Sequence, residues 1–247
     1  MKRFLTAGLV VGLLPMLIPA AQAQSPGAAS AQSPAAAAAP IVWTLDRLEA
    51  IGGHPTMVLG QPRVIEAAAQ AAAGGQPADA AASKALAFDG VDDGLIVDAN
   101  PLSGLATFTV EVIFRPERGG PAAQRFVHLQ EAGSDNRLLF ETRLIAGDRW
   151  FLDTFLKCGS GNHTLFAEQH PHPIGPWYHA AVTVDGRLMR HYVNGKEELA
   201  QAVDFRPLGP GQTSLGVRLN QVSWYQGAIR TLRITPRVLA PAEFLKP

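Results

Sequence analysis

Apolar and polar residues alternate with a period of two over much of this chain, most clearly between Trp177 and Gly195. That period is typical of a strand with one buried face. The alternation is interrupted at Asp185-Gly186 and ends at Asn194-Gly195, and both dipeptides suit the positive φ angles of tight turns. The pattern predicts a β-hairpin over 177–193, followed by a second turn.

The same alternation predicts strands on both sides of the hairpin. In the stretch 107–115 we expect one face to lie in the core (Phe108, Val110, Val112, Phe114) and the other to lie outside it (Thr109, Glu111, Ile113, Arg115). Further strands are expected at 41–45, 56–59, 63–66, 85–88, 94–98, 125–130, 137–145, 150–157, 213–218, 223–224 and 228–234, with a helical turn at 243–245. Many short strands separated by turns favour an all-β fold, a two-sheet antiparallel β-sandwich or jelly roll.

The N-terminus has the three parts of a secretory signal peptide. Lys2-Arg3 precede an apolar run over 4–18, and Ala21-Gln22-Ala23 then predicts cleavage after residue 23. Residues 24–40 are almost only Ala, Ser, Pro, Gln and Gly, which predicts a disordered linker before a folded domain over 41–247. We therefore expect a secreted or periplasmic protein without a transmembrane segment after cleavage, and a flexible loop over 67–83.

Composition narrows the class of protein further. Of the 247 residues 47% are hydrophobic, enough for a large core, and 21 basic residues balance 21 acidic ones. No basic block is present, so nucleic acid is not an expected partner. Cys158 is the single cysteine, which excludes an internal disulfide and makes a small strand-end residue the preferred interpretation.

Five segments in order resemble the landmarks of a known family. They are LAFDGVDDG at 86–94, FTVEV at 108–112, WYHAAVTVDG at 177–186, YVNG at 192–195, and GAIRTLRI at 227–234 with LAPAEF at 239–244. They look like laminin-G-like jelly-roll domains of the concanavalin A-like lectin/glucanase superfamily, over residue 41 to the C-terminus. The resemblance implies a concave polar sheet face and, in some members, a calcium site at the rim. Asp92 and Asp93 fit a turn better than that site, so calcium stays open as a cofactor.

Polar residues at alternate positions of one strand, which we call residues of equal parity, point to the same face of a sheet and mark candidate binding faces. We expect shared faces for Phe126, His128 and Gln130, for Glu141 and Arg143, for Asp153 and Lys157, and for Glu111 and Arg115. Neighbouring strands would bring a histidine, carboxylates and an arginine together on one concave surface. That collection of groups points to carbohydrate.

The leading hypothesis is a lectin-like domain that recognises a polysaccharide or other glycan on this concave face. The expected ligand-binding residues are His128, Glu141, Arg143, Asp153, Lys157, His170, His172, Trp224 and Tyr225. His170 and His172 lie in a proline-stiffened segment that we expect to cap the cleft rather than to bind a metal. Trp224 and Tyr225 are the preferred platform for stacking a sugar ring, whereas Trp177 and His179 are expected to be structural.

Two alternatives stay open. The same face suits a polysaccharide hydrolase or lyase with Glu141, Arg143, His128 and Asp153 as catalytic residues. In the lyase form His128 and Arg143 would act with Tyr192 on a uronate, although the acidic signature of the family's hydrolases is absent. The other alternative is a protein-protein adhesion module. The sequence does not identify the glycan or the oligomeric state.

Overall fold

The computed structural model describes Gly8, residues 38–67 and residues 84–247, and the two longer stretches form the folded unit. The expected signal peptide apart from Gly8, the linker up to residue 37 and the loop expected over 67–83, apart from the buried Ala67, lie outside the described residues. Within the described part of the chain, no helix has the length and apolar character needed to cross a bilayer.

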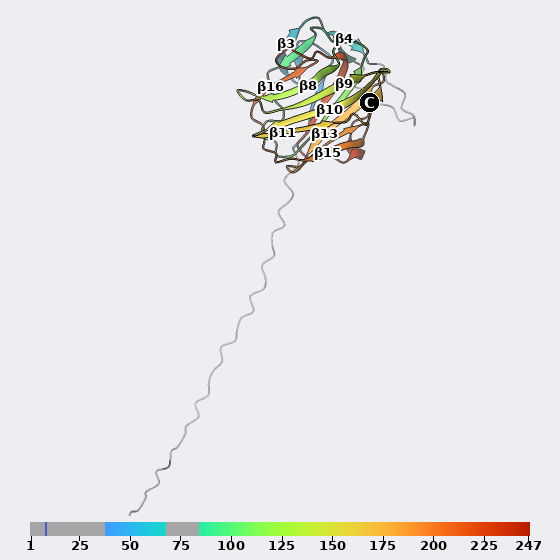
Figure 1. Cartoon of the computed structure of the whole chain (residues 1–247). Coiled ribbons are helices and arrows are strands. Elements are labelled where there is room, and N and C mark those ends of the chain that lie inside the picture. Colours follow the sequence, from blue (N-terminus) through green and yellow to red (C-terminus); the bar gives the residue numbers. More distant parts are fainter. Residues whose placement is uncertain (1–7, 9–37, 68–83) are drawn as a thin grey trace, which may run out of the picture. The chain divides into compact units, whose positions relative to one another are not determined.

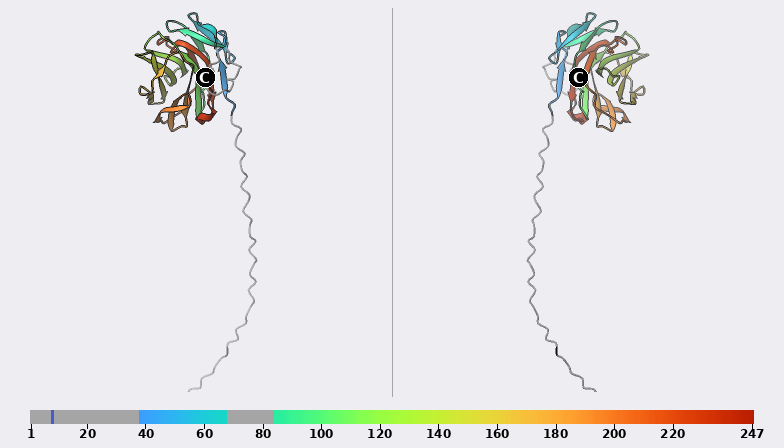
Figure 2. Two further views of the ribbon diagram at one scale, coloured as in Figure 1. Left: turned by 90° about the vertical axis from the view of Figure 1, so that its right-hand side faces the viewer. Right: turned by 90° about the vertical axis from the view of Figure 1, so that its left-hand side faces the viewer.

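The folded unit is a sandwich of two antiparallel sheets, as predicted (Figure 1). The first sheet has the order β15 (Lys196–Ala202), β14 (Leu188–Val193), β13 (Tyr178–Val184), β7 (Phe108–Pro116), β17 (Gln226–Thr235), β5 (Lys84–Asp89) and β4 (Arg63–Glu66). Strand β1 (Ile41–Thr44) also pairs with β17, and Figure 2 shows this blue strand beside the red one.

The second sheet carries the candidate site. Its order is β11 (Gly161–Phe166), β10 (Arg149–Cys158), β9 (Arg137–Ile145), β8 (Ala123–Glu131), β16 (Gly211–Leu215), β6 (Gly94–Val97), β3 (His54–Leu59) and β2 (Ala50–Ile51), and β12 (His172–Pro173) also pairs with β10. A 3₁₀ turn, η1 (Pro241–Glu243), lies slightly earlier than the expected helical turn.

The predicted hairpin is confirmed as β13 and β14, paired from Ala180 with Val193 to Val184 with Met189. Its turn residue Gly186 has φ 92°, and the second turn has φ 49° at Asn194 and 80° at Gly195. Asparagine and glycine tolerate this left-handed region better than other residues do. The chain therefore returns as β15, which extends the meander by one strand.

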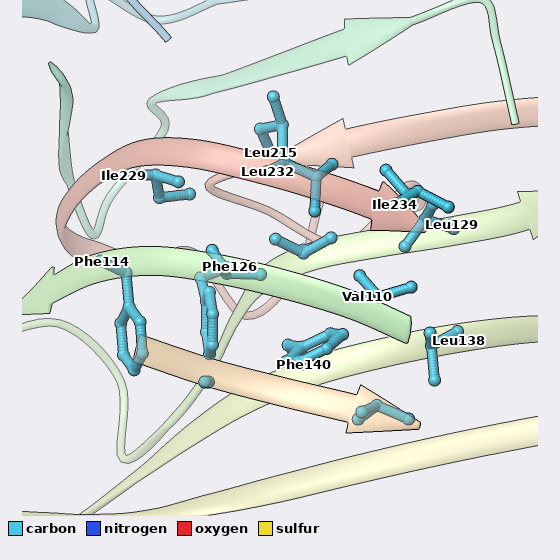
Figure 3. Close-up of a cluster of buried hydrophobic side chains, with 14 of the residues drawn as sticks. Val110, Phe114, Phe126, Leu129, Leu138, Phe140, Leu215, Ile229, Leu232 and Ile234 are labelled. Carbon is cyan, nitrogen blue, oxygen red and sulfur yellow. The ribbon is translucent and has the colours of Figure 1, made fainter. Parts of the chain in front are cut away.

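Aromatic side chains from both sheets meet in the core between them. Phe108, Val110, Val112 and Phe114 of β7 are fully buried, as expected. Phe114 stacks on Phe126 with ring centroids 4.4 Å apart (Figure 3). Trp150 meets Phe114 edge-on at 5.2 Å. Cys158 is buried and unpaired, so apolar packing stabilises the sandwich without a disulfide.

A β-bulge in β8 changes which residues face the core. Arg125 lies opposite Glu141, but Val127 lies opposite Phe140, so Phe126 is an extra residue. Phe126 joins Val127 and Leu129 in the core. The expectation that Phe126 shares a face with His128 and Gln130 is therefore wrong.

Some element predictions also fail. Residues 223–224 form no strand, and the strand expected at 213–218 ends at Leu215. Strands β11 and β15 were not predicted, because their sequences, GNHTLF and KEELAQA, lack a clean apolar face. Both are outer strands of their sheets and contact each other along one side of the sandwich.

The C-terminal segment covers part of the outer face of the first sheet and is held there by Glu111. The side chain of Glu111 is completely buried. Its carboxylate accepts hydrogen bonds from Arg233 and, at 2.8 Å, from the backbone N–H of Leu245, and His179 Nε2 lies 3.0 Å from its Oε1. The His179 ring also packs on Phe244 at 5.1 Å. Glu111 and His179 are therefore structural residues.

We predict that Glu111→Ala lowers the free energy of unfolding by about 3–5 kcal/mol, because the substitution leaves the buried His179 and the part-buried Arg233 without their carboxylate partner. Glu117→Ala is the matched control, since Glu117 forms a partly exposed ion pair with Arg115; it should cost about 0–1 kcal/mol. Urea unfolding of both variants tests this. Equal losses would contradict the structural role of Glu111.

Candidate functional site

A shallow hollow of about 220 Å³ lies on the outer face of the second sheet, over β8, β9 and β10. We call it the arginine hollow. It is lined by Arg125, Arg137, Leu139, Glu141, Arg143, Asp153, Phe155, Thr164 and Arg218. Strand β9 alternates strictly here, so its residues 137, 139, 141 and 143 share this face while Leu138 and Phe140 enter the core.

Two buried carboxylates form the floor of the arginine hollow. Glu141 and Asp153 are paired residues on β9 and β10, and each side chain is only 3% exposed. Arg143 joins them, because its Nη2 lies 2.6 Å from Asp153 Oδ2 and 3.1 Å from Glu141 Oε2. Arg125 Nε lies 3.1 Å from Glu141 Oε1. The acidic residues thus lie under the arginines, and the guanidinium groups are the more exposed members of the cluster.

Burial dominates the electrostatics of both carboxylates. It raises the pKa of Glu141; Arg125 opposes the shift and the neighbouring Asp153 adds to it. Burial likewise raises the pKa of Asp153, against its hydrogen bond from Arg143. Removing an ionised group from water disfavours its charged form. Each carboxylate therefore depends on the arginines to remain ionised.

Aromatic rings support two of the arginines. The guanidinium carbon of Arg137 lies 4.7 Å from the centroid of Phe155, and that of Arg143 lies 5.6 Å from the centroid of Phe166. Phe166 is 47% exposed, which is unusual for a phenylalanine. Lys157 pairs with Asp135 at 2.5 Å beside the hollow. The surface therefore combines flat cations with one exposed and one half-buried apolar ring.

A second hollow of about 690 Å³ adjoins the first on the same face. Ile96, Asp98, Gln130 and Gln212 contribute to its lining, together with Leu219, which directly follows Arg218. Gln130 of this second hollow is paired with Arg137 of the arginine hollow. Together the two hollows lie over β6, β16, β8, β9 and β10, which are neighbouring strands of the second sheet.

The structure brings together Glu141, Arg143 and Asp153 as predicted, with Lys157 beside them, but it places His128 differently. His128 is 1% exposed, and its Nδ1 accepts the N–H of Leu219 at 3.0 Å. Burial, reinforced by Arg218 and Arg137, lowers its pKa to about 3. The neutral ring then carries its proton on Nε2 and is no general base. Tyr192 lies in β14 of the other sheet, so the lyase trio is not assembled.

The two predicted loop histidines also lie away from the hollow. His172 faces the edge between the sheets, where its Nε2 is 2.7 Å from Glu198 Oε1 and its ring is 5.0 Å from that of the core residue Trp150. His170 is half-buried in the preceding turn, where its backbone N–H donates a hydrogen bond to the Ala167 carbonyl. The segment pairs with the beginning of β10 and does not line the arginine hollow.

Of the two aromatic residues predicted to stack on a sugar ring, one is buried in the core and the other is half-buried. Tyr225 is fully buried, with its ring 5.5 Å from Phe126 and 6.4 Å from Phe88, so it cannot stack on a sugar. Trp224 is half-buried and follows Ser223, whose hydroxyl accepts a 2.6 Å hydrogen bond from Arg125. Trp224 thus remains a candidate at the rim, and Phe155 and Phe166 supply rings that the sequence reasoning missed.

The residues of the hollow that were not predicted differ in how clearly the sequence pattern indicated them. Arg137 and Phe155 share the parity of Glu141 and Asp153, so the alternation already indicated them. Arg125 was hidden by the bulge at Phe126, which reverses the parity of β8. Arg218 follows β16 in a loop, and no periodic pattern predicts its position.

Comparison with known proteins identifies the family. Residues 89–244 match the laminin G family model described as "Concanavalin A-like lectin/glucanases superfamily". The chain belongs to this superfamily. No protein among the curated ones matches it in sequence.

Solved structures of the superfamily fold agree with the sandwich at low sequence identity. Domain 4 of AbnA, a GH43 extracellular arabinanase from Geobacillus stearothermophilus in complex with arabinotriose, matches with TM-score 0.59 and 18% identity over 82% of this chain and 94% of that one. The heptameric SAP-like pentraxin from Limulus polyphemus matches with TM-score 0.51 and 17% identity over 63% and 76%. The binding domain of Paraclostridial Mosquitocidal Protein 1 gives 0.56 and 15% over 83% and 50%, so this chain spans half of that domain.

Calcium is the ion that the superfamily resemblance implies, and the acidic cluster Asp89, Asp92 and Asp93 is the place to test it. Asp89 Oδ1 accepts the N–H groups of residues 91, 92 and 93 at 2.9–3.3 Å. Asp93 accepts the N–H of Gln61 through Oδ1 at 2.6 Å and that of Asp89 through Oδ2 at 3.1 Å. Asp89 Oδ1 and both Asp93 oxygens are therefore already engaged in the turn, and a cluster of three carboxylates with these oxygens engaged supplies few of the about six to eight oxygen ligands that a calcium ion takes.

We predict opposite pH profiles for two substitutions. The raised pKa of Glu141 means that its contribution to the free energy of unfolding falls as pH rises from 4.5 through the folded-state pKa. Burial also raises the pKa of Glu111, but hydrogen bonds from His179, Arg233 and Leu245 outweigh it, so the net pKa is lowered. Its contribution is complete above 4.5 and is lost as pH falls through the folded-state pKa.

Urea unfolding from about pH 3 to pH 7 measures both. The stability difference, wild type minus variant, should decrease with rising pH for Glu141→Gln and increase for Glu111→Gln. Slopes of the same sign would contradict the assigned environments.

Proposed function

We propose that this protein is an exported carbohydrate-binding domain that holds a polysaccharide across the outer face of its second sheet. The observation that carries the proposal is the pair of adjoining hollows across five neighbouring strands. A linear polymer matches an open groove of this shape, whereas a small ligand is normally enclosed in a deeper cavity. The residues expected to act as a signal peptide support export.

The chemistry of the arginine hollow suits a sugar chain. Sugar rings present apolar faces that pack on aromatic rings such as Phe155 and Phe166, and hydroxyl groups that accept hydrogen bonds from guanidinium groups. Arg143 and Arg125 are positioned in advance by Glu141 and Asp153, so little side-chain entropy is lost when a ligand binds. The related fold that was solved with arabinotriose supports carbohydrate as the ligand class.

Polysaccharide cleavage is the second candidate, favoured by two neighbouring carboxyl groups whose pKa values are raised. General acid catalysis uses such a group. Glu141 and Asp153 nevertheless lie beneath Arg143, with their side chains 3% exposed, and a glycosidic oxygen must reach the acid directly. Binding without cleavage therefore fits the geometry better. Calcium has no role in the proposal.

We predict that the purified protein is retarded by at least one polysaccharide in native affinity gels and that it does not shorten the polymer. Phe155→Ala should weaken this binding by about tenfold, because it removes a ring that packs on the sugar and supports Arg137. Val64→Ala is the control, since Val64 is a 40%-exposed apolar residue on β4 of the other sheet.

The panel should pair neutral with uronate and sulfated polymers, and the size of each polymer should be measured after incubation. Absence of retardation by every polymer would overturn the proposal. Shortening of a polymer that Glu141→Gln abolishes would replace binding with cleavage.

A further inference from the structure

Among the residues that the structure describes, two arginines of the arginine hollow have no carboxylate partner. Arg125 and Arg143 are ion-paired with Glu141 and Asp153. The one hydrogen bond that Arg137 makes in the described structure is from Nη1 to the backbone carbonyl of Asp135 at 2.6 Å, and its Nε is buried without a partner. Within the described residues, the side chain of Arg218 makes no hydrogen bond or ion pair and is half-buried.

The position of Arg137 is fixed although its charge is not neutralised. Its guanidinium group lies over the ring of Phe155 at 4.7 Å, a cation–π arrangement that holds the group flat on the floor of the hollow. The Asp135 carboxylate, which is close in sequence, is bound to Lys157 at 2.5 Å instead. A buried donor without an acceptor costs free energy, so the Arg137 guanidinium is suited to an acceptor that the ligand supplies.

Arg218 adds a second positive charge beside the first. Burial and the charge of Arg218 both lower the pKa of the Arg137 guanidinium. The same two arginines help to lower the pKa of His128, which is therefore neutral beneath them and adds no charge of its own. The hollow as a whole thus has four guanidinium groups against two carboxylates. Like charges close together are favoured when an anion lies between them.

We propose that Arg137 and Arg218 form a subsite for an anionic group of the glycan, a uronate carboxylate or a sulfate ester. This inference rests on the proposed function and specifies its ligand class. A guanidinium group presents two parallel N–H donors that match the two oxygens of such an anion, and the bond is charge-assisted. Arg125 and Arg143 remain bound to their carboxylates and contact sugar hydroxyl groups instead.

The test uses polymers that differ only in charge. Polygalacturonate is compared with its fully methyl-esterified form, and dextran sulfate with dextran, by affinity gel and by titration calorimetry at a physiological salt concentration. The wild type should bind at least one charged polymer about tenfold or more tightly than its neutral match, the equivalent of one charge-assisted hydrogen bond. The pair that shows the preference identifies carboxylate or sulfate as the anion.

Three variants locate the effect. Arg137→Gln and Arg218→Gln should each remove most of the preference for the charged polymer, while binding to the neutral polymer changes little. Arg187→Gln should leave the preference intact, because Arg187 is an exposed arginine in the β13–β14 turn of the other sheet. Thermal melting checks that each variant is folded. If Arg137→Gln does not fold, Arg218→Gln still tests the subsite, because Arg218 lies in a loop.

The failures of the two proposals are distinguishable. Equal binding of charged and neutral polymers overturns the anionic subsite and leaves glycan binding standing. Equal loss of preference in Arg187→Gln also overturns the subsite, because the attraction is then a property of net charge. No binding to any polymer overturns the proposed function itself.

Discussion

The extra residue that β8 carries at Phe126 determines which side chains enter the core and which reach the surface. On its inner side Phe126 stacks with Phe114 at 4.4 Å and so joins the two sheets near the centre of the sandwich. On its outer side the bulge keeps Arg125 opposite Glu141 and places His128 and Gln130 on the same face. In a regular strand, either the side chains before the bulge or those after it would point to the opposite face of the sheet. Core packing and site geometry therefore depend on a single irregularity.

The arginine hollow shows how a sheet face changes its apparent charge when acidic groups are buried. Glu141 and Asp153 lie at the floor, and Arg125 and Arg143 cover them. A ligand approaching this face therefore meets guanidinium groups and aromatic rings before it meets carboxylates. The geometry favours a binding surface over a catalytic acid–base pair, because the most basic and most exposed groups are those that cannot exchange a proton near neutral pH.

Much of the fold follows directly from the alternation of residues, and the landmark segments specified the family. The boundaries of β4 and β9 agree with the sequence prediction. Strands β11 and β15 were missed because they are rich in polar residues and lie at the edge of the sandwich. They are strands because they hydrogen-bond to a neighbouring strand, not because of an apolar pattern of their own. Local sequence does not record such tertiary pairing.

The candidate site was predictable only in part. Parity placed Glu141, Arg143, Asp153 and Lys157 on one face correctly, because β9 and β10 are regular. It misassigned Phe126, since the inserted residue reverses the parity between Arg125 and the residues that follow it. It also proposed Tyr225 for stacking, although the ring turns inward against Phe88 and Phe126. Arg218 depends on the path of a loop, which residue periodicity does not encode.

The central claim is that the outer face of the second sheet binds a polysaccharide chain. It is tested most directly by recording ¹H–¹⁵N correlation spectra of the labelled protein during titration with short oligosaccharides of the polymer that retards it. The account predicts shifts confined to amides of β6, β8, β9, β10, β11 and β16 and of the loop at residues 218–219, with the first sheet unchanged. Shifts concentrated on β13, β14 or β15 would contradict it, because they would place the ligand on the opposite side of the sandwich.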